Sequence, residues 1–124
     1  MIHGDAHAGN IFETSGGPGL IDWQLVQRGV WAADVAYHIG AVLDIDDRRR
    51  SEFDLLRHYL TRLSIYGVEP PAWEEALVQY RRYLAYGLHL WAMTQFVDDN
   101  ITTQFVQRLG QAVADNESFQ LLSV

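Results

Sequence analysis

Three polar side chains in the first 22 residues have the types and the spacing that phosphoryl transfer requires. Asn10 follows Asp5 by five positions, and Asp22 lies between an isoleucine and a tryptophan. A carboxylate such as Asp5 can orient an acceptor hydroxyl and take its proton, while an amide and a second carboxylate can hold Mg²⁺ against nucleotide phosphates. Asp5 is therefore the candidate catalytic base, and Asn10 and Asp22 are the candidate metal ligands.

Asp22 is the residue that favours a phosphoryl-transfer site over a simple turn. An Asp–Asn pair in a loop usually does no more than form a turn. A charged residue inside an apolar strand is unfavourable unless something compensates its charge. A bound divalent cation would do so, and the alternative is an Asp that caps the turn after the strand. Because Asp5 and Asn10 stand at the right offsets, we favour the metal ligand.

His3 and His7 flank Asp5, and this pattern also permits a second interpretation. Two imidazoles and a carboxylate bind Zn²⁺ in many metal-dependent hydrolases. Further ligands at suitable spacing are not evident in the sequence. We therefore expect His3 to pack beneath the loop and His7 to form a hydrogen bond within it, and the hydrolase stays as the less favoured alternative.

A β-hairpin is the first element that must position these side chains. Short apolar runs at 10–13 and 19–23 enclose the turn signal TSGGP. A five-residue loop over 14–18 predicts a register in which Asn10 pairs with Asp22. Directly paired residues share one face of a hairpin, so this register places the two candidate metal ligands side by side.

About four helices are expected after the hairpin, so the predicted fold class is α+β, mostly α. Residues 31–43 are apolar nearly all round, which indicates a buried helix. Asp46 or Asp47 can cap a second helix that runs to about residue 66 and stops at Gly67. Two more helices follow, with breaks at Pro70-Pro71 and at Asp98-Asp99-Asn100, over about 72–96 and 102–115.

Other notable residues on these helices have simpler interpretations. Arg48-Arg49-Arg50 lies among acidic residues and indicates a solvated helix face. The helical tryptophans are expected to anchor the core, with Trp91, Asp98 and Asp99 as secondary candidates for contact with a cationic substrate. The helical histidines are expected to be core or surface residues: His38, His58 and His89.

Composition excludes several classes of function. The net charge of −7 argues against a nucleic-acid or anionic-membrane partner, because both require a basic surface. The absence of cysteine excludes disulfides and Cys-ligated zinc. Without a signal-peptide pattern or an apolar run of about 18 residues, we expect a cytoplasmic protein. All nine basic residues are arginine, so this chain cannot supply a lysine to nucleotide phosphates.

The motifs HGDAHAGN, IDW and DVAY together resemble the aminoglycoside phosphotransferase and choline-kinase-like family, whose members are relatives of the protein kinases. The resemblance covers residues 1–37 and is specific in its combination of loop and IDW. It implies Asp5 as catalytic base and Asn10 and Asp22 as Mg²⁺ ligands. It also implies that Asp34 braces the catalytic loop by accepting hydrogen bonds from it, beside the supporting roles expected above for His3 and His7. For Asp34 the alternative is an acid favoured by the helix dipole.

The resemblance further implies ATP-dependent transfer of phosphate to the hydroxyl of a small molecule, with Mg²⁺ and ATP as cofactors. Residues 1–124 would then form the C-terminal lobe of a protein-kinase-like domain, without the N-terminal nucleotide-binding lobe. We expect such a chain to be inactive alone. We also expect an exposed apolar face near Met1, Ile2 and the hairpin, through which the chain would meet the missing lobe or a second copy of itself. The alternative is a non-catalytic lobe fragment or pseudo-kinase that binds metal or a partner.

Overall fold

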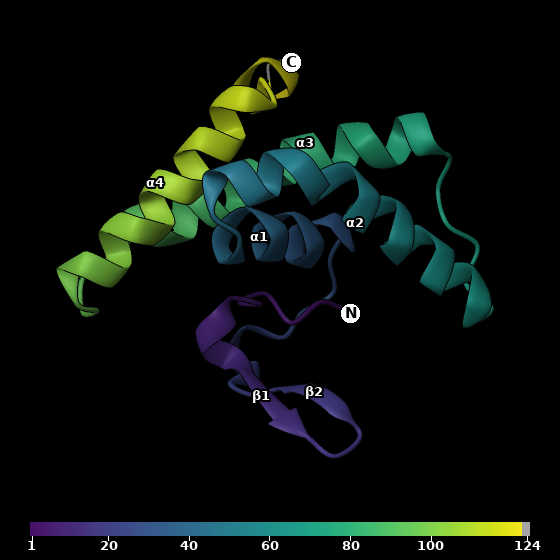
Figure 1. Cartoon of the computed structure of the whole chain (residues 1–124), viewed down its shortest axis with the longest axis horizontal. Helices are drawn as coiled ribbons and strands as arrows, with labels where there is room; N and C mark the ends of the chain where they lie inside the picture. Colours follow the sequence, from purple (N-terminus) through teal and green to yellow (C-terminus); the bar gives the residue numbers. More distant parts are fainter. Residues whose placement is uncertain (123–124) are drawn as a thin grey trace.

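The computed structural model describes residues 1–122, in which a small hairpin precedes a helical body (Figure 1). Short elements come first: the 3-10 helix η1 (Ala8–Asn10), the antiparallel strands β1 (Ile11–Thr14) and β2 (Gly17–Leu20), and the 3-10 helix η2 (Trp23–Leu25). The helical part of the described chain then comprises α1 (Ala32–Val42), α2 (Ile45–Ile65), α3 (Trp73–Ala92), α4 (Asp99–Asp115) and the 3-10 helix η3 (Ser118–Leu121). The expected mostly helical architecture is confirmed.

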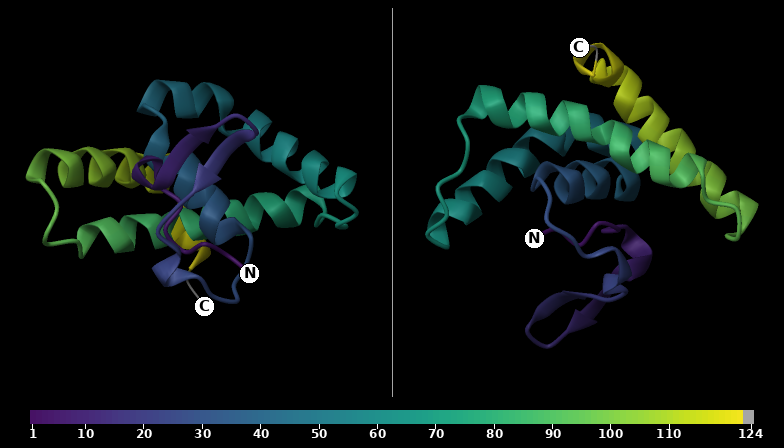
Figure 2. Two further views of the ribbon diagram at one scale, coloured as in Figure 1. Left: turned by 90° about the horizontal axis from the view of Figure 1, so that it is seen from below. Right: turned by 180° about the vertical axis from the view of Figure 1, so that it is seen from behind.

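Helix α1 lies at the centre of the molecule, and the hairpin projects from the helical body (Figure 2). α1 contacts α2, α3 and α4, and most of its residues are buried. Its Ala36 and Ile39 belong to a core that also contains Leu56 of α2 and Tyr80 and Leu84 of α3. The buried helix expected over 31–43 is therefore confirmed, because an all-round apolar sequence is stable only when each face meets another element.

The hairpin turn is tighter than expected. Thr14 pairs with Gly17, so the turn consists of residues 15–16 and not of the five residues 14–18. The Thr14 hydroxyl donates to the Gly17 carbonyl oxygen (2.5 Å) and accepts from the Gly16 N–H (3.2 Å). Gly17 has a φ of 113°, a conformation that glycine adopts without steric cost. The threonine hydroxyl and this glycine together stabilise a two-residue turn.

The tighter turn moves the register by one residue. Ile11 pairs with Leu20, and the N–H of Ile21 donates to the carbonyl oxygen of Asn10 (2.9 Å). Ile21 therefore lies opposite Asn10, and the expected pairing of Asn10 with Asp22 is wrong. Asp22 instead follows the strand with a positive φ of 62°, at the start of η2.

Helix ends differ from expectation at two places. α2 begins after Asp44, two residues or more before the expected caps, and Gly67 follows its end as expected. α3 ends at Ala92, and the residues expected as a break begin α4 instead. The Asp98 carboxylate accepts from the Asn100 N–H (2.8 Å), which makes it an N-cap for the last helix.

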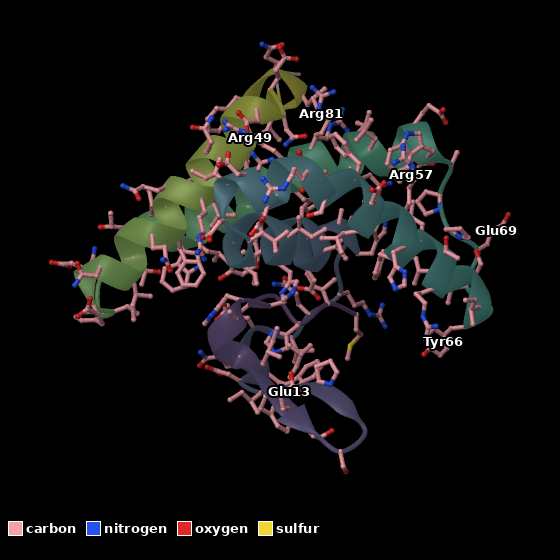
Figure 3. The ribbon with its side chains drawn as sticks, in the orientation of Figure 1. Glu13, Arg49, Arg57, Tyr66, Glu69 and Arg81 are labelled. Atoms are coloured by element: carbon pink, nitrogen blue, oxygen red, sulfur yellow. The ribbon has the colours of Figure 1, made fainter. Side chains whose placement is uncertain are left out.

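The solvated face expected at the arginine triplet is confirmed for Arg49 and Arg50, which are exposed, and is wrong for Arg48, which is fully buried. Its guanidinium pairs with Glu52 (2.7 Å) and with Asp115 of α4. Glu52 also accepts from the Tyr80 hydroxyl (2.9 Å) and from the Asn116 amide (3.3 Å). These five residues, here called the arginine cluster, join α2 to α3 and to the end of α4. Figure 3 labels the neighbouring Arg49 beside α4, where it also binds Asp115.

The hairpin and the segment after it keep an exposed apolar surface, here called the hairpin apolar face. Its members are Phe12, Leu20, Ile21, Trp23, Leu25 and Val26. The exposed surface expected near the hairpin is thus confirmed, whereas Ile2 is buried. Ile2 forms a two-way backbone bridge with Gln27 (2.9 and 3.2 Å), which holds the first residues against the segment that follows η2.

No helix within residues 1–122 combines the length and the apolar character that crossing a membrane requires.

Candidate active site

The loop at residues 3–5 is held by the carboxylate of Asp34. Its Oδ2 accepts from the backbone N–H of His3 (2.6 Å) and its Oδ1 from that of Gly4 (2.8 Å). Gly4 has a φ of 87°, and a Cβ there would lie 2.5 Å from the Leu25 carbonyl oxygen, so the position requires glycine. Asp34 lies in the first turn of α1, and it therefore fixes the loop to the central helix.

The His3 imidazole is fully engaged within the protein. Its Nδ1 accepts from the Asp5 N–H (3.2 Å), so the ring proton lies on Nε2, which donates to the Ile21 carbonyl oxygen (2.9 Å). The ring is buried and packs edge-on against Trp23 at 4.6 Å. His3 has no lone pair left for zinc. Within residues 1–122, no group of three His, Cys, Asp or Glu side chains is arranged to hold a metal.

His7 forms a hydrogen bond within the loop and is kept neutral by its surroundings. Its Nδ1 accepts from the Gly9 N–H (3.0 Å) and caps η1. Burial lowers the pKa of His7, and the carboxylates of Asp5 and Asp22 partly oppose that shift. The His7 Nε2 lies 3.7 Å from Asp5 Oδ2, so the ring stands beside the carboxylate of the candidate base.

The Asp5 carboxylate is oriented on both oxygens and is still partly open. Its Oδ1 accepts from the Tyr37 hydroxyl (2.9 Å) and its Oδ2 from the Asn10 amide (3.3 Å). The side chain remains 21% exposed. Because each carboxylate oxygen accepts more than one hydrogen bond, Asp5 can still accept the proton of an incoming hydroxyl.

Asn10 and Asp22 each present an oxygen suited to a hard cation. Asn10 is buried, and its Nδ2 donates to the Asp5 carbonyl oxygen (2.9 Å) as well as to the Asp5 carboxylate, so these two bonds do not use the amide oxygen. Asp22 is exposed, and its carboxylate accepts only a long hydrogen bond from Gln24 Nε2 (3.4 Å) among the described contacts. Amide and carboxylate oxygens are ligands that Mg²⁺ accepts, so the residues fit this ion.

Sequence reasoning missed a second group of residues that holds the loop from the helices. The Tyr86 hydroxyl donates to the Gly4 carbonyl oxygen (2.7 Å), and His38 Nδ1 donates to that of Ala6 (2.8 Å). His38 was expected to be a simple core or surface residue. The available signal was spacing, since Tyr37 and His38 follow Asp34 by three and four positions and so share its face of α1.

Trp91 is a core residue and not an exposed contact for a cation. Its indole is buried, stacks on Phe105 with ring centroids 4.2 Å apart, and donates from Nε1 to the Tyr37 hydroxyl (2.6 Å). The expectation that Trp91 anchors the core is confirmed. Its secondary candidacy for contact with a cationic substrate is wrong, because the indole is buried between the helices and the His7 ring.

A cavity of about 580 Å³ lies between the hairpin and the helices. Apolar side chains of the hairpin, α1 and α2 make up most of its wall, including Ile11, Leu20, Val35, Ile39 and Leu55. Asp5, Asn10 and Asp22 do not line it. The polar groups suited to phosphoryl transfer therefore lie outside this apolar cavity.

A comparison with models of protein families identifies a match. The sequence model of the phosphotransferase enzyme family matches residues 1–78, which is more than half of the chain and includes the loop, the hairpin, α1 and α2. No curated protein and no solved structure matches the chain significantly.

Proposed function

Because this chain belongs to the phosphotransferase enzyme family, we propose that it carries the acceptor-activating part of an ATP-dependent transfer of phosphate to a small-molecule hydroxyl. The observation that carries the proposal is the state of Asp5. Its carboxylate is fixed by two neutral donors, Tyr37 and Asn10, and still faces solvent. A general base must be oriented toward the hydroxyl and free to take its proton, and Asp5 meets both conditions.

Asn10 and Asp22 are the residues that would hold Mg²⁺ in this proposal. When bound, Mg²⁺ would supply positive charge against the negative charge of the nucleotide phosphates. Asn10 would contribute an amide oxygen to it and Asp22 a carboxylate oxygen. The roles of the two residues would thus differ from that of Asp5, which contacts the acceptor.

The nucleotide-binding lobe would come from outside these 124 residues. The chain contains no lysine to contact the phosphates, and the hairpin apolar face offers a surface that such a lobe would cover. Transfer depends on holding phosphate and acceptor together. The chain alone is therefore expected to show little or no turnover.

Metal binding is tested on the chain alone with Mn²⁺ as a paramagnetic substitute for Mg²⁺. We expect Mn²⁺ to broaden the NMR signals of Asn10 and Asp22 at lower concentrations than those of the acidic residues elsewhere in the chain. Asp22→Asn should weaken this broadening. Asp54→Asn is the control, because Asp54 is exposed on α2 and pairs only with Arg57 among the described contacts. Broadening centred on other acidic residues, unchanged in Asp22→Asn, would refute these ligands.

Turnover is tested after the chain is joined to a nucleotide-binding lobe, by following ADP release with a panel of small alcohols and sugars. Asp5→Asn is expected to lower kcat by about 10²–10⁴-fold, the usual effect of losing a general base, with nucleotide affinity retained. Asp22→Asn should mainly weaken the binding of metal-nucleotide. Full activity in Asp5→Asn would show that Asp5 is not the base.

A further inference from the structure

A chain of hydrogen bonds runs from the far side of the core to the candidate base. The Trp91 indole N–H donates to the Tyr37 hydroxyl oxygen (2.6 Å), and the Tyr37 hydroxyl donates to Asp5 Oδ1 (2.9 Å). The indole can only donate and the carboxylate can only accept, so the direction of both bonds is fixed. Burial and the Asp5 carboxylate raise the pKa of Tyr37 well above its usual value, which keeps the phenol protonated as a donor.

Tight packing holds the middle of this chain. Tyr37 is fully buried. Its ring lies against the backbone of α3 at Gly87, where an added Cβ would stand 2.6 Å from Tyr37 Cδ2, and Tyr86 packs edge-on against it at 6.3 Å. A side chain enclosed in this way keeps a single rotamer. The Tyr37 hydroxyl is therefore a fixed donor and not one that adapts to Asp5.

Trp91 is held equally firmly, and it reaches the loop directly at His7 and indirectly through Tyr37. Its ring stacks on Phe105 of α4 at 4.2 Å and also meets the His7 ring edge-on at 5.4 Å. Trp91 thus reaches Asp5 through Tyr37 and touches His7, the other ring beside the carboxylate. The end of α3 and the face of α4 are in this way connected to the position of the base.

We propose that Tyr37 and Trp91 are positioning residues for Asp5, Tyr37 by fixing the carboxylate rotamer and Trp91 by fixing Tyr37. The inference rests on the proposed function, in which Asp5 is the base. With Oδ1 directed to Tyr37, the carboxylate plane is set, and Oδ2 beside Asn10 is the oxygen turned toward the incoming hydroxyl. Alignment matters because misplacement of a reacting group by about 1 Å costs on the order of 10²-fold in rate.

The first test uses NMR on the 124-residue chain and needs no activity. Scalar couplings between Hα and Hβ report the Asp5 rotamer, which should be single in the parent, averaged in Tyr37→Phe and intermediate in Trp91→Phe. The Trp91 indole N–H signal should move in Asp5→Asn, because hydrogen bonds in a chain polarise one another. The matched control is Tyr80→Phe, which removes a buried hydroxyl that donates to Glu52 in the arginine cluster. Asp5 couplings equal in Tyr37→Phe and the parent would overturn the proposal.

The second test separates positioning from a structural role through kinetics of the chain joined to a nucleotide-binding lobe. Tyr37→Phe should lower kcat by about 10–10²-fold and change the KM for ATP less than twofold, since it alters alignment and not phosphate binding. Tyr80→Phe should leave kcat unchanged even where it lowers stability as much. Equal kcat losses in the two variants would overturn the proposal. If the parent shows no transfer at all, the proposed function fails, and the NMR couplings still decide whether Tyr37 positions Asp5.

Discussion

The arginine cluster and the loop at residues 3–10 each present a carboxylate to the same two kinds of neutral donor, a tyrosine hydroxyl and an asparagine amide. Glu52 accepts from a tyrosine hydroxyl at 2.9 Å and an asparagine amide at 3.3 Å, and Asp5 does so at the same two distances. In the cluster all donors meet on one oxygen, Glu52 Oε2, together with Arg48 at 2.7 Å. In the loop the tyrosine and the asparagine occupy different oxygens of Asp5, and no arginine or lysine is paired with it among the described residues.

The two carboxylates differ in whether an arginine is paired with them: Glu52 is paired with the Arg48 guanidinium, and Asp5 is paired with none among the described residues. Glu52 is buried and its charge is neutralised by Arg48, so it has nothing left to offer a ligand. Asp5 is oriented by neutral groups only, and its charge is still available. Neutral donors can fix the orientation of a carboxylate and leave its negative charge uncompensated. A guanidinium fixes the orientation and also neutralises the charge. The absence of a paired cationic side chain therefore distinguishes the candidate catalytic carboxylate better than its hydrogen-bond donors do.

Removing the Arg48 guanidinium should give the largest change in the free energy of unfolding. Arg48→Met leaves Glu52 buried with no cation, and loss of one member of a buried ion pair costs about 3–5 kcal/mol. Arg50→Met is the control, because Arg50 is exposed and pairs with Asp47 in the same helix, so its loss should change stability by about 0.5 kcal/mol or less. Urea unfolding at neutral pH measures both. Similar losses in the two variants would mean that the buried pair contributes no more than a surface pair.

Weakening the support of the loop should have a smaller effect. Asp34→Asn removes the charge that accepts two backbone N–H bonds and leaves one acceptor, at a cost of about 2 kcal/mol. Amide hydrogen exchange should speed up at His3 and Gly4 more than in the core of α1. Unchanged exchange at these two amides would show that the loop holds its conformation without the Asp34 charge.

Acid should weaken the arginine cluster through Asp115. Hydrogen bonding from Arg49 holds the pKa of Asp115 below its usual range, so the folded protein binds this proton less readily than the unfolded chain. The stabilisation is complete above about pH 4 and is lost as pH falls below it. Because the carboxylate is partly exposed, we expect about 1 kcal/mol. Asp115→Asn should flatten the fall in stability between about pH 4 and 2 relative to Asp54→Asn, and equal slopes would contradict this.

The smallest change in folding stability should come from the hairpin apolar face. Ile21→Ser and Val26→Ser replace side chains that are 48% and 41% exposed, so each should alter stability by about 0.5 kcal/mol or less. The same changes should reduce self-association and the binding of a hydrophobic dye, since exposed apolar patches promote both. Light scattering and dye fluorescence measure this. A parent chain that is monomeric and binds no dye would remove the reason to expect a partner at this face.

The hydrogen bonds within the loop at residues 3–10 were easier to predict from the sequence than the contacts around it, because local spacing sets the loop. Asp5, Asn10 and the glycine at position 4 lie within a few residues of one another. Arg48 was misjudged because the acids near it in sequence suggested a solvated face, whereas Asp115 lies 67 residues away. The register was missed because a threonine hydroxyl, and not the length of the polar segment, determines the turn. Roles that depend on contacts between distant elements, such as that of Tyr86 toward Gly4, left no comparable pattern in the sequence.

At Gly87, a change that favours the stability of α3 would disturb the position of the Tyr37 ring. Glycine in a helix interior costs roughly 0.5–1 kcal/mol relative to alanine, so selection for a more stable α3 would favour replacing it. The added methyl group would stand 2.6 Å from the Tyr37 ring and would have to displace it. Such a substitution could raise the helicity of α3 while moving the hydroxyl that fixes Asp5. An alanine at position 87, which would otherwise be a conservative change that favours the helix, is therefore expected to lower the turnover of the proposed reaction.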